Sequence, residues 1–71
     1  MMVKVDDYIS NKVLVTEFAV ANFVELEHQL VEANKHLDCP LRILAHHRSR
    51  FIEVWSGDGQ ALMARYTPIG N

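Results

Sequence analysis

Cysteine is almost absent from this sequence. Cys39 is the only one, so the chain cannot close a disulfide with itself, and a single thiol fits a reducing compartment. Long apolar runs are absent too, and the start of the chain, MMVKVDDYIS, lacks the apolar segment of a secretion signal. We therefore expect no membrane association and a cytoplasmic location, either in the protein's own cell or in a virus-infected host.

A strong excess of charge of one sign is also missing. The net charge is −2, so the chain is neither acidic enough to mimic DNA nor basic enough to bind nucleic acid by charge alone. The two signs are nevertheless separated, because every lysine lies within residues 1–38 and every arginine lies within residues 39–71. Any recognition that depends on arginine therefore belongs to the second half of the chain.

Length limits the protein as well. The chain has 71 residues, of which 49% are hydrophobic, and this predicts one small folded domain over residues 1–71 rather than disorder. A chain this short buries only about 60% of its unfolded surface. Its core is therefore small, and a partner that adds buried surface would help to stabilise it.

A hairpin is predicted near the start of the chain. Residues 3–9 and 13–18 are rich in β-branched and aromatic side chains, and Ser10, Asn11 and Lys12 between them favour a turn. The alternative is a helix beginning near Asp6, which the alternating valines of both segments disfavour.

One amphipathic helix is predicted after this hairpin. Asn22 and Glu25 can form a capping box at its start, and Pro40 lies just beyond its end. Apolar residues recur at steps of three and four and define a single face. They are Ala19, Phe23, Leu26, Leu30, Ala33 and Leu37.

Three further strands are predicted in residues 41–49, 50–55 and 61–67, although residues 41–48 also fit a short helix. The resulting order is ββαβββ, which describes an α+β fold with a small, mostly antiparallel sheet and one amphipathic helix.

The last two strands are predicted to form a tight hairpin. Asp58-Gly59 suits a two-residue type I′ turn. In this register Trp55 faces Leu62, Val54 faces Met63, Glu53 faces Ala64 and Phe51 faces Tyr66. Phe51, Trp55, Leu62 and Tyr66 would then share one face of the sheet, with Ile52, Val54, Met63 and Arg65 on the other.

This hairpin is apolar on both faces, and one helix can cover only one face of a sheet. The uncovered face needs either a partner, such as a second copy, or the N-terminal hairpin folded over it. Trp55 is then either a core residue, which we favour, or an exposed anchor for a partner.

Catalytic and metal sites are not expected. The sequence contains no nucleophile elbow and no phosphate-binding loop, so we predict that the protein is not an enzyme. The potential ligands His36, Cys39, His46 and His47 follow no standard zinc spacing. His28, Glu32 and His36 lie along the polar face of the helix, where charged residues are expected in any case. We predict no metal and no cofactor.

The arginines point instead to a macromolecular partner. Arginine and aromatic residues are enriched in protein–protein interfaces, so we expect a non-enzymatic protein-binding module, an adaptor or an inhibitor of the kind found among small viral accessory proteins. The expected partner-binding residues are Arg42, His46, Arg48, Arg50, Ile52, Val54, Met63 and Arg65. The alternative is a small nucleic-acid-binding protein that uses the four arginines, and steep salt dependence of binding would distinguish it.

Self-association is also expected. Val20, Val24 and Val31 form a second apolar stripe beside the main helix face. This stripe is either the margin of the core or a candidate oligomer contact.

Overall fold

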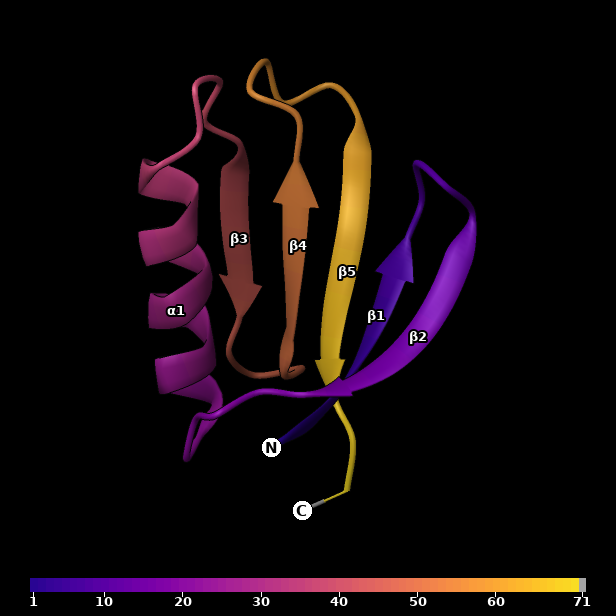
Figure 1. Cartoon of the computed structure of the whole chain (residues 1–71), viewed down its shortest axis with the longest axis vertical. Coiled ribbons are helices and arrows are strands. Elements are labelled where there is room, and N and C mark those ends of the chain that lie inside the picture. Colours follow the sequence, from indigo (N-terminus) through magenta and orange to yellow (C-terminus); the bar gives the residue numbers. More distant parts are fainter. Residues whose placement is uncertain (71) are drawn as a thin grey trace.

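The computed structural model describes residues 1–70, which form one five-stranded sheet and one helix (Figure 1). The order ββαβββ and the small α+β fold are confirmed, and residues 42–46 form a strand rather than a helix. The elements are β1 (Met2–Asp7), β2 (Lys12–Glu17), α1 (Phe23–Lys35), β3 (Arg42–His46), β4 (Phe51–Trp55) and β5 (Leu62–Pro68).

The strands lie in the order β2-β1-β5-β4-β3, and all neighbouring pairs are antiparallel. The last strand of the sequence, β5, is therefore central, between the N-terminal hairpin and the β3–β4 hairpin (Figure 1). The N-terminal hairpin extends the sheet sideways, so it does not cover the face that the sequence leaves exposed.

The core lies on one side of the sheet only. Strand pairing and the alternation of side chains place the buried residues of β1 and β4 on the side that α1 covers. Leu26 of α1 and Ile52 of β4 are fully buried at its centre. The buried residues of the described chain are Val3, Val5, Phe23, Leu26, Ile52 and Val54.

The helix begins as its capping residues predict. The Asn22 side chain accepts a hydrogen bond from the Glu25 backbone N–H at 2.9 Å, while the Glu25 carboxylate accepts from the Ala21 N–H at 2.8 Å. The predicted helix face was too long at both ends, because Ala19 and Leu37 lie outside the helix. The chain bends before Asn22 instead, and the backbone N–H groups of residues 36 and 37 already bond to carbonyls three residues back.

The first turn is longer than predicted. Tyr8 and Ile9 belong to the turn rather than to a strand. The Asp7 carboxylate accepts hydrogen bonds from the Ile9 and Ser10 N–H groups at 2.9 and 3.2 Å, and hydrogen bonds from Ser10 lower its pKa. Asn11 completes the turn at a φ of 57°, a conformation that asparagine tolerates well.

The predicted two-residue turn at Asp58-Gly59 was wrong. β4 and β5 are joined by residues 56–61, and Asp58 lacks the positive φ that a type I′ turn requires. The Asp58 carboxylate accepts hydrogen bonds from the Ser56 hydroxyl at 2.6 Å and from the Gln60 N–H at 3.0 Å. These local hydrogen bonds stabilise a wider loop than the dipeptide alone predicts.

The register of this hairpin also differs from the prediction. Trp55 does face Leu62, but an irregularity then shifts the ladder by one residue, so that Val54 faces Ala64 and Glu53 faces Arg65. Tyr66 consequently faces Ile52 on the helix side, and the predicted Phe51–Tyr66 pair does not form. A slip of one residue exchanges the two faces of a strand.

No helix in residues 1–70 combines the length and the apolar character required to cross a membrane.

Candidate functional site

The face of the sheet opposite α1, here called the open face, has no covering layer within residues 1–70. None of its side chains is among the buried residues, although several are large and apolar. Leu44 is 50% exposed, and Val13 and Val15 at the far edge are more than half exposed. The side chains of its β3–β4–β5 part include Arg42, Leu44, His46, Phe51, Glu53, Trp55 and Arg65.

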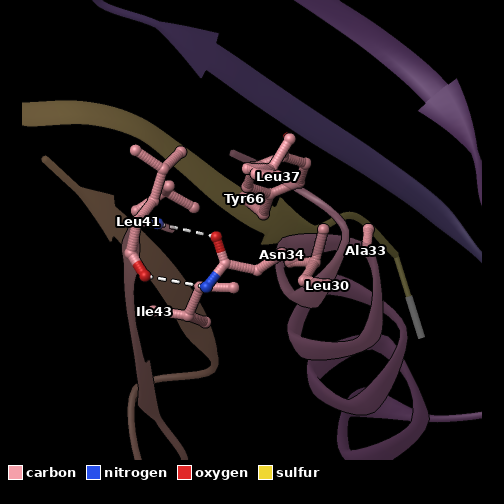
Figure 2. Close-up of a pocket in the computed structure, with 8 residues that line it drawn as sticks. Leu30, Ala33, Asn34, Leu37, Leu41, Ile43 and Tyr66 are labelled. Carbon is pink, nitrogen blue, oxygen red and sulfur yellow. Dashed lines mark hydrogen bonds between the residues drawn. The ribbon is translucent and has the colours of Figure 1, made fainter. Parts of the chain in front are cut away.

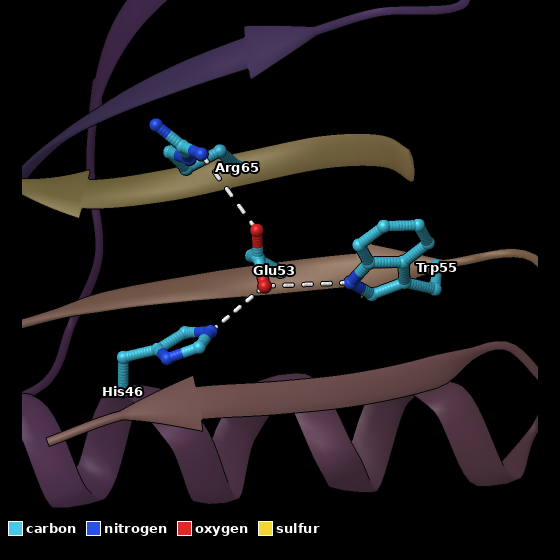
Figure 3. A network of polar contacts seen from close by, with 4 residues as sticks. All are labelled: His46, Glu53, Trp55 and Arg65. Atoms are coloured by element: carbon cyan, nitrogen blue, oxygen red, sulfur yellow. Dashed lines mark hydrogen bonds and ion pairs between the residues drawn. The ribbon is translucent and has the colours of Figure 1, made fainter. Parts of the chain in front are cut away.

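Glu53 lies at the centre of this part and connects three strands (Figure 3). Its Oε1 atom lies 2.7 Å from Nε2 of His46 on β3, and it accepts a longer hydrogen bond from the Trp55 indole N–H at 3.5 Å. Its other oxygen lies 3.7 Å from Nη2 of Arg65 on β5, which makes an ion pair without a close hydrogen bond. One carboxylate thus orients an imidazole, an indole and a guanidinium.

These contacts keep Glu53 ionised. The hydrogen bond with His46 contributes most to lowering the pKa of its carboxyl group, and burial opposes it. The Trp55 hydrogen bond and the positive charge of Arg65 lower the pKa further. The Glu53 side chain is only 14% exposed, so its charge is held within the sheet surface and not in bulk water.

Aromatic stacking adds rigidity beside Glu53. The His46 imidazole stacks on the Phe51 ring with centroids 4.4 Å apart and an interplanar angle of 24°. The Arg65 guanidinium lies over the same ring, 4.7 Å from its centroid. The Arg65 Nε–H is buried without a hydrogen-bond partner, so packing rather than hydrogen bonding holds this end of the side chain.

The predicted partner-binding residues separate into three groups. Arg42, His46 and Arg65 lie on the open face, as their strand pairing requires. Ile52 and Val54 are 0% and 8% exposed beneath α1, so they are not part of this surface. The third group lies in a loop or at a strand irregularity and consists of Arg48, Arg50 and Met63.

Arg48 and Arg50 are exposed in the loop between β3 and β4, and Met63 lies at the irregularity in β5. Arg50 adopts a φ of 60°, while its N–H donates to the His46 carbonyl at 2.7 Å. Leu44, Phe51 and Glu53 also lie on the open face but were not among the predicted partner-binding residues. Trp55, predicted to be either a core residue or a partner anchor, lies on the open face too and is partly exposed. Glu53 was visible in the sequence as a lone carboxylate in an apolar strand.

A hollow lies at the end of the open face opposite the Arg48–Arg50 loop. It has a volume of about 370 Å³ and is lined by Arg42, Ile43, Leu44, Trp55 and Gly59. The Arg42 Nε–H donates to the Gly57 carbonyl at 2.9 Å, which fixes the guanidinium beside the loop. Gly59 has a φ of +76°, and a side chain there would start 3.0 Å from Arg42 Nη1, so glycine keeps this end of the hollow open.

A smaller cavity lies on the other side of the sheet, beneath the C-terminal half of α1 (Figure 2). Its volume is about 160 Å³, and apolar side chains form most of its wall. The Asn34 amide in this wall is already bonded to both backbone groups of Leu41, at 2.7 and 2.8 Å. These two hydrogen bonds of the Asn34 amide tie α1 to the start of β3. Tyr66 closes the cavity toward β5, and burial raises its pKa, which the charge of Asp7 raises further.

The remaining candidate residues are dispersed. His47 pairs with Glu27 of α1 at 3.0 Å and packs edge-on against Phe23. Cys39 is exposed in the loop before β3. Within residues 1–70, no three histidine, cysteine or acidic side chains gather as a metal site would require.

The predicted valine stripe is also divided. Val20 precedes the helix and packs against the core, which corrects its predicted place on the helix. Val24 and Val31 do lie on α1, and they are 48% and 37% exposed.

No family model, curated protein or solved structure matches this chain.

Proposed function

We propose that this chain is a non-enzymatic protein-binding module that docks its open face onto another protein. The observation that carries the proposal is a one-sided core: the helix side holds every buried side chain of residues 1–70, while on the open face Leu44 is half exposed and Phe51 and Trp55 are partly exposed. Large apolar surface of this kind, surrounded by polar groups, is typical of interaction sites.

The side chains of the open face are already restrained before binding, and this supports the same proposal. Binding is weakened by the entropy lost when flexible side chains are fixed, at about 0.5–1.5 kcal/mol for each. Glu53 already restrains Trp55 and Arg65, and Phe51 restrains His46 by stacking. Tryptophan and arginine are the residues that most often dominate interface energies. The hollow beside Trp55 would receive one apolar side chain of the partner.

The positions of the arginines favour protein over nucleic acid. Arg42 and the Arg48–Arg50 loop lie at opposite ends of β3, and Arg65 is paired with Glu53. Phosphate recognition requires several free cations along one track. Arginines that are separated in this way suit individual contacts at the margin of a protein interface.

The cytoplasm is the proposed location. Cys39 is a free and exposed thiol, which fits a reducing environment in which it is not oxidised.

The test is affinity capture from lysate of the source cell, with Leu44→Lys as the open-face variant. Leu44 is half exposed and lies directly opposite Glu53, so a lysine there meets a carboxylate and leaves the fold intact. We expect wild type to retain a partner protein that the variant releases. Mass spectrometry identifies the retained chains, and the capture is repeated after nuclease treatment and in about 0.5 M salt.

The matched control is Val24→Lys, which adds the same charge at a similarly exposed position on α1. It should retain the partner. Loss of the partner from the Val24 variant alone would place binding on the helix, and release by nuclease or salt would favour the nucleic-acid alternative.

A further inference from the structure

The outer edge of β2 is a free sheet edge with apolar side chains on both faces. Val13 and Val15 point to the open face and are 63% and 54% exposed, while Leu14 points to the helix side and is 48% exposed. Strand β2 contains no proline, and charged residues occur only at its ends, Lys12 and Glu17. Natural sheets normally protect such an edge with charge, proline or a covering element.

The backbone groups that point away from this edge can be identified. Met1 and Phe18 exchange hydrogen bonds, since the Phe18 N–H donates to the Met1 carbonyl at 2.8 Å and the Met1 ammonium donates to the Phe18 carbonyl at 2.9 Å. Hydrogen-bonded pairs alternate along an antiparallel ladder. Leu14 therefore bonds to β1, whereas the N–H and C=O groups of Val13 and Val15 point outward.

The opposite edge of the sheet is not free in this way. Leu41, which directly precedes β3, gives both of its backbone groups to the Asn34 side chain of α1. The helix lies alongside β3 at that edge of the sheet (Figure 1). The two ends of the sheet therefore differ, because α1 lies beside the β3 edge and no element of residues 1–70 lies beside the β2 edge (Figure 1).

We propose that β2 pairs antiparallel with β2 of a second copy, about a two-fold axis through Leu14. In this register Val13 of each copy faces Val15 of the other, and their outward N–H and C=O groups bond reciprocally. Leu14 faces its own copy, and Lys12 faces Thr16, so no like charges meet. The result is one continuous sheet across both copies.

The self-complementary sequence selects a second copy over an unrelated strand. A two-fold axis perpendicular to the sheet keeps each side chain on its own face, so valine covers valine on the open face and leucine covers leucine on the helix side. Each pair removes apolar surface that β2 alone leaves exposed. This pairing does not depend on whether the open face binds another protein.

Light scattering after size exclusion tests the pairing, from about 1 µM to about 500 µM protein. We expect the mass to rise toward twice the chain mass of 8.1 kDa. The double variant Val13→Lys with Val15→Lys sets ammonium groups opposite each other across the two-fold axis, and it should weaken the dimer about tenfold or more. The double variant Val24→Lys with Val31→Lys is the control on α1 and should dimerise like wild type.

The register has its own test, on a Cys39→Ser background. Leu14→Cys places two thiols across a non-hydrogen-bonded pair with Cα atoms about 4.5 Å apart, within the range that a disulfide spans. Thr16→Cys is the control on the same strand and face, where the two thiols would be more than about 10 Å apart. Under mild oxidation the Leu14 variant should cross-link much faster.

Three results would overturn the pairing. A mass of 8.1 kDa at every concentration excludes the dimer. A dimer that survives the β2 substitutions and is lost in the α1 variant lies on the helix instead. Equal cross-linking of the Leu14 and Thr16 variants contradicts the two-fold axis through Leu14.

Discussion

At the scale of single residues, Glu53 links stability to pH. Its pKa is lower in the folded chain than the ordinary value of 4.5, chiefly because of the His46 hydrogen bond. A carboxylate with a depressed folded pKa stabilises the fold fully above the unfolded pKa, and this contribution disappears as the pH falls through the folded pKa. Acid should therefore weaken the wild-type fold through this residue.

We predict that Glu53→Gln lowers the free energy of unfolding by about 1 kcal/mol at about pH 7, and that the deficit shrinks as the pH approaches about 3. The other groups that face this carboxylate, His46, Trp55 and Arg65, remain present in both proteins. Urea unfolding at a series of pH values measures the difference. Glu17→Gln on β2 controls for the loss of one charge, and a deficit that is constant with pH would refute the assignment to Glu53.

Arg50 is strained at the residue scale. Its φ of 60° lies in the left-handed region, which costs residues with a β-carbon about 1–2 kcal/mol. Glycine removes this cost but adds about 0.5–1 kcal/mol of unfolded-state entropy. We predict that Arg50→Gly raises the free energy of unfolding by up to about 1 kcal/mol. Stability then does not account for an arginine at this position, which agrees with a contact to a partner.

The neighbouring position supplies the control for Arg50. Arg48 lies in the same loop and does not have a positive φ, so Arg48→Gly should leave stability unchanged or lower it by up to about 1 kcal/mol. Urea midpoints of the two variants give the comparison. Equal losses in both would show that the backbone of Arg50 is not strained.

At the scale of elements, α1 holds the sheet through very few residues. Leu26 is fully buried, and Leu→Ala at such a site typically costs about 2–5 kcal/mol. A domain of this size has only about 3–5 kcal/mol in total. We predict that Leu26→Ala leaves most chains unfolded at room temperature, as measured by circular dichroism and urea titration.

Val31→Ala on the exposed side of the same helix should behave differently. Val31 is 37% exposed, and alanine is the better helix former by about 0.5 kcal/mol. We expect a change of less than about 0.5 kcal/mol in either direction. A loss at Val31 as large as that at Leu26 would mean that α1 packs through a different face.

The positions of the helix and the strands were more predictable than the register between the strands. The apolar spacing around Leu26 and the cap at Asn22 identified the helix, because both signals are local in sequence. The loop at 56–61 was not predictable from its dipeptide, since Asp58 bonds to neighbours on both sides of it. The register shift moved Tyr66 to the side of Ile52, and α1 covers that side, so Ile52 and Val54 are buried although they were predicted to bind a partner.

At the scale of the whole molecule, the sheet is held together by its last strand. Val3 pairs with Pro68, and the Ile69 N–H donates to the Met2 carbonyl at 2.9 Å, so the two ends of the described chain are neighbours. Within residues 1–70, β5 is the only element that pairs with both the N-terminal hairpin and the β3–β4 hairpin. Sequence alone did not predict this order, because each local hairpin signal is compatible with several sheets.

The central position of β5 has a consequence for synthesis. A ribosome makes the N-terminal hairpin, the helix and the β3–β4 hairpin before the strand that joins them exists. Until β5 emerges, the nascent chain has two separate hairpins whose apolar edges cannot pair correctly, and isolated hairpins are marginal in water. Folding of the complete sheet must therefore follow translation of β5. This folding step is slow for so short a chain, because it requires contacts between residues at the two ends of the chain. Chaperone binding during that interval would protect the same apolar strands from premature association.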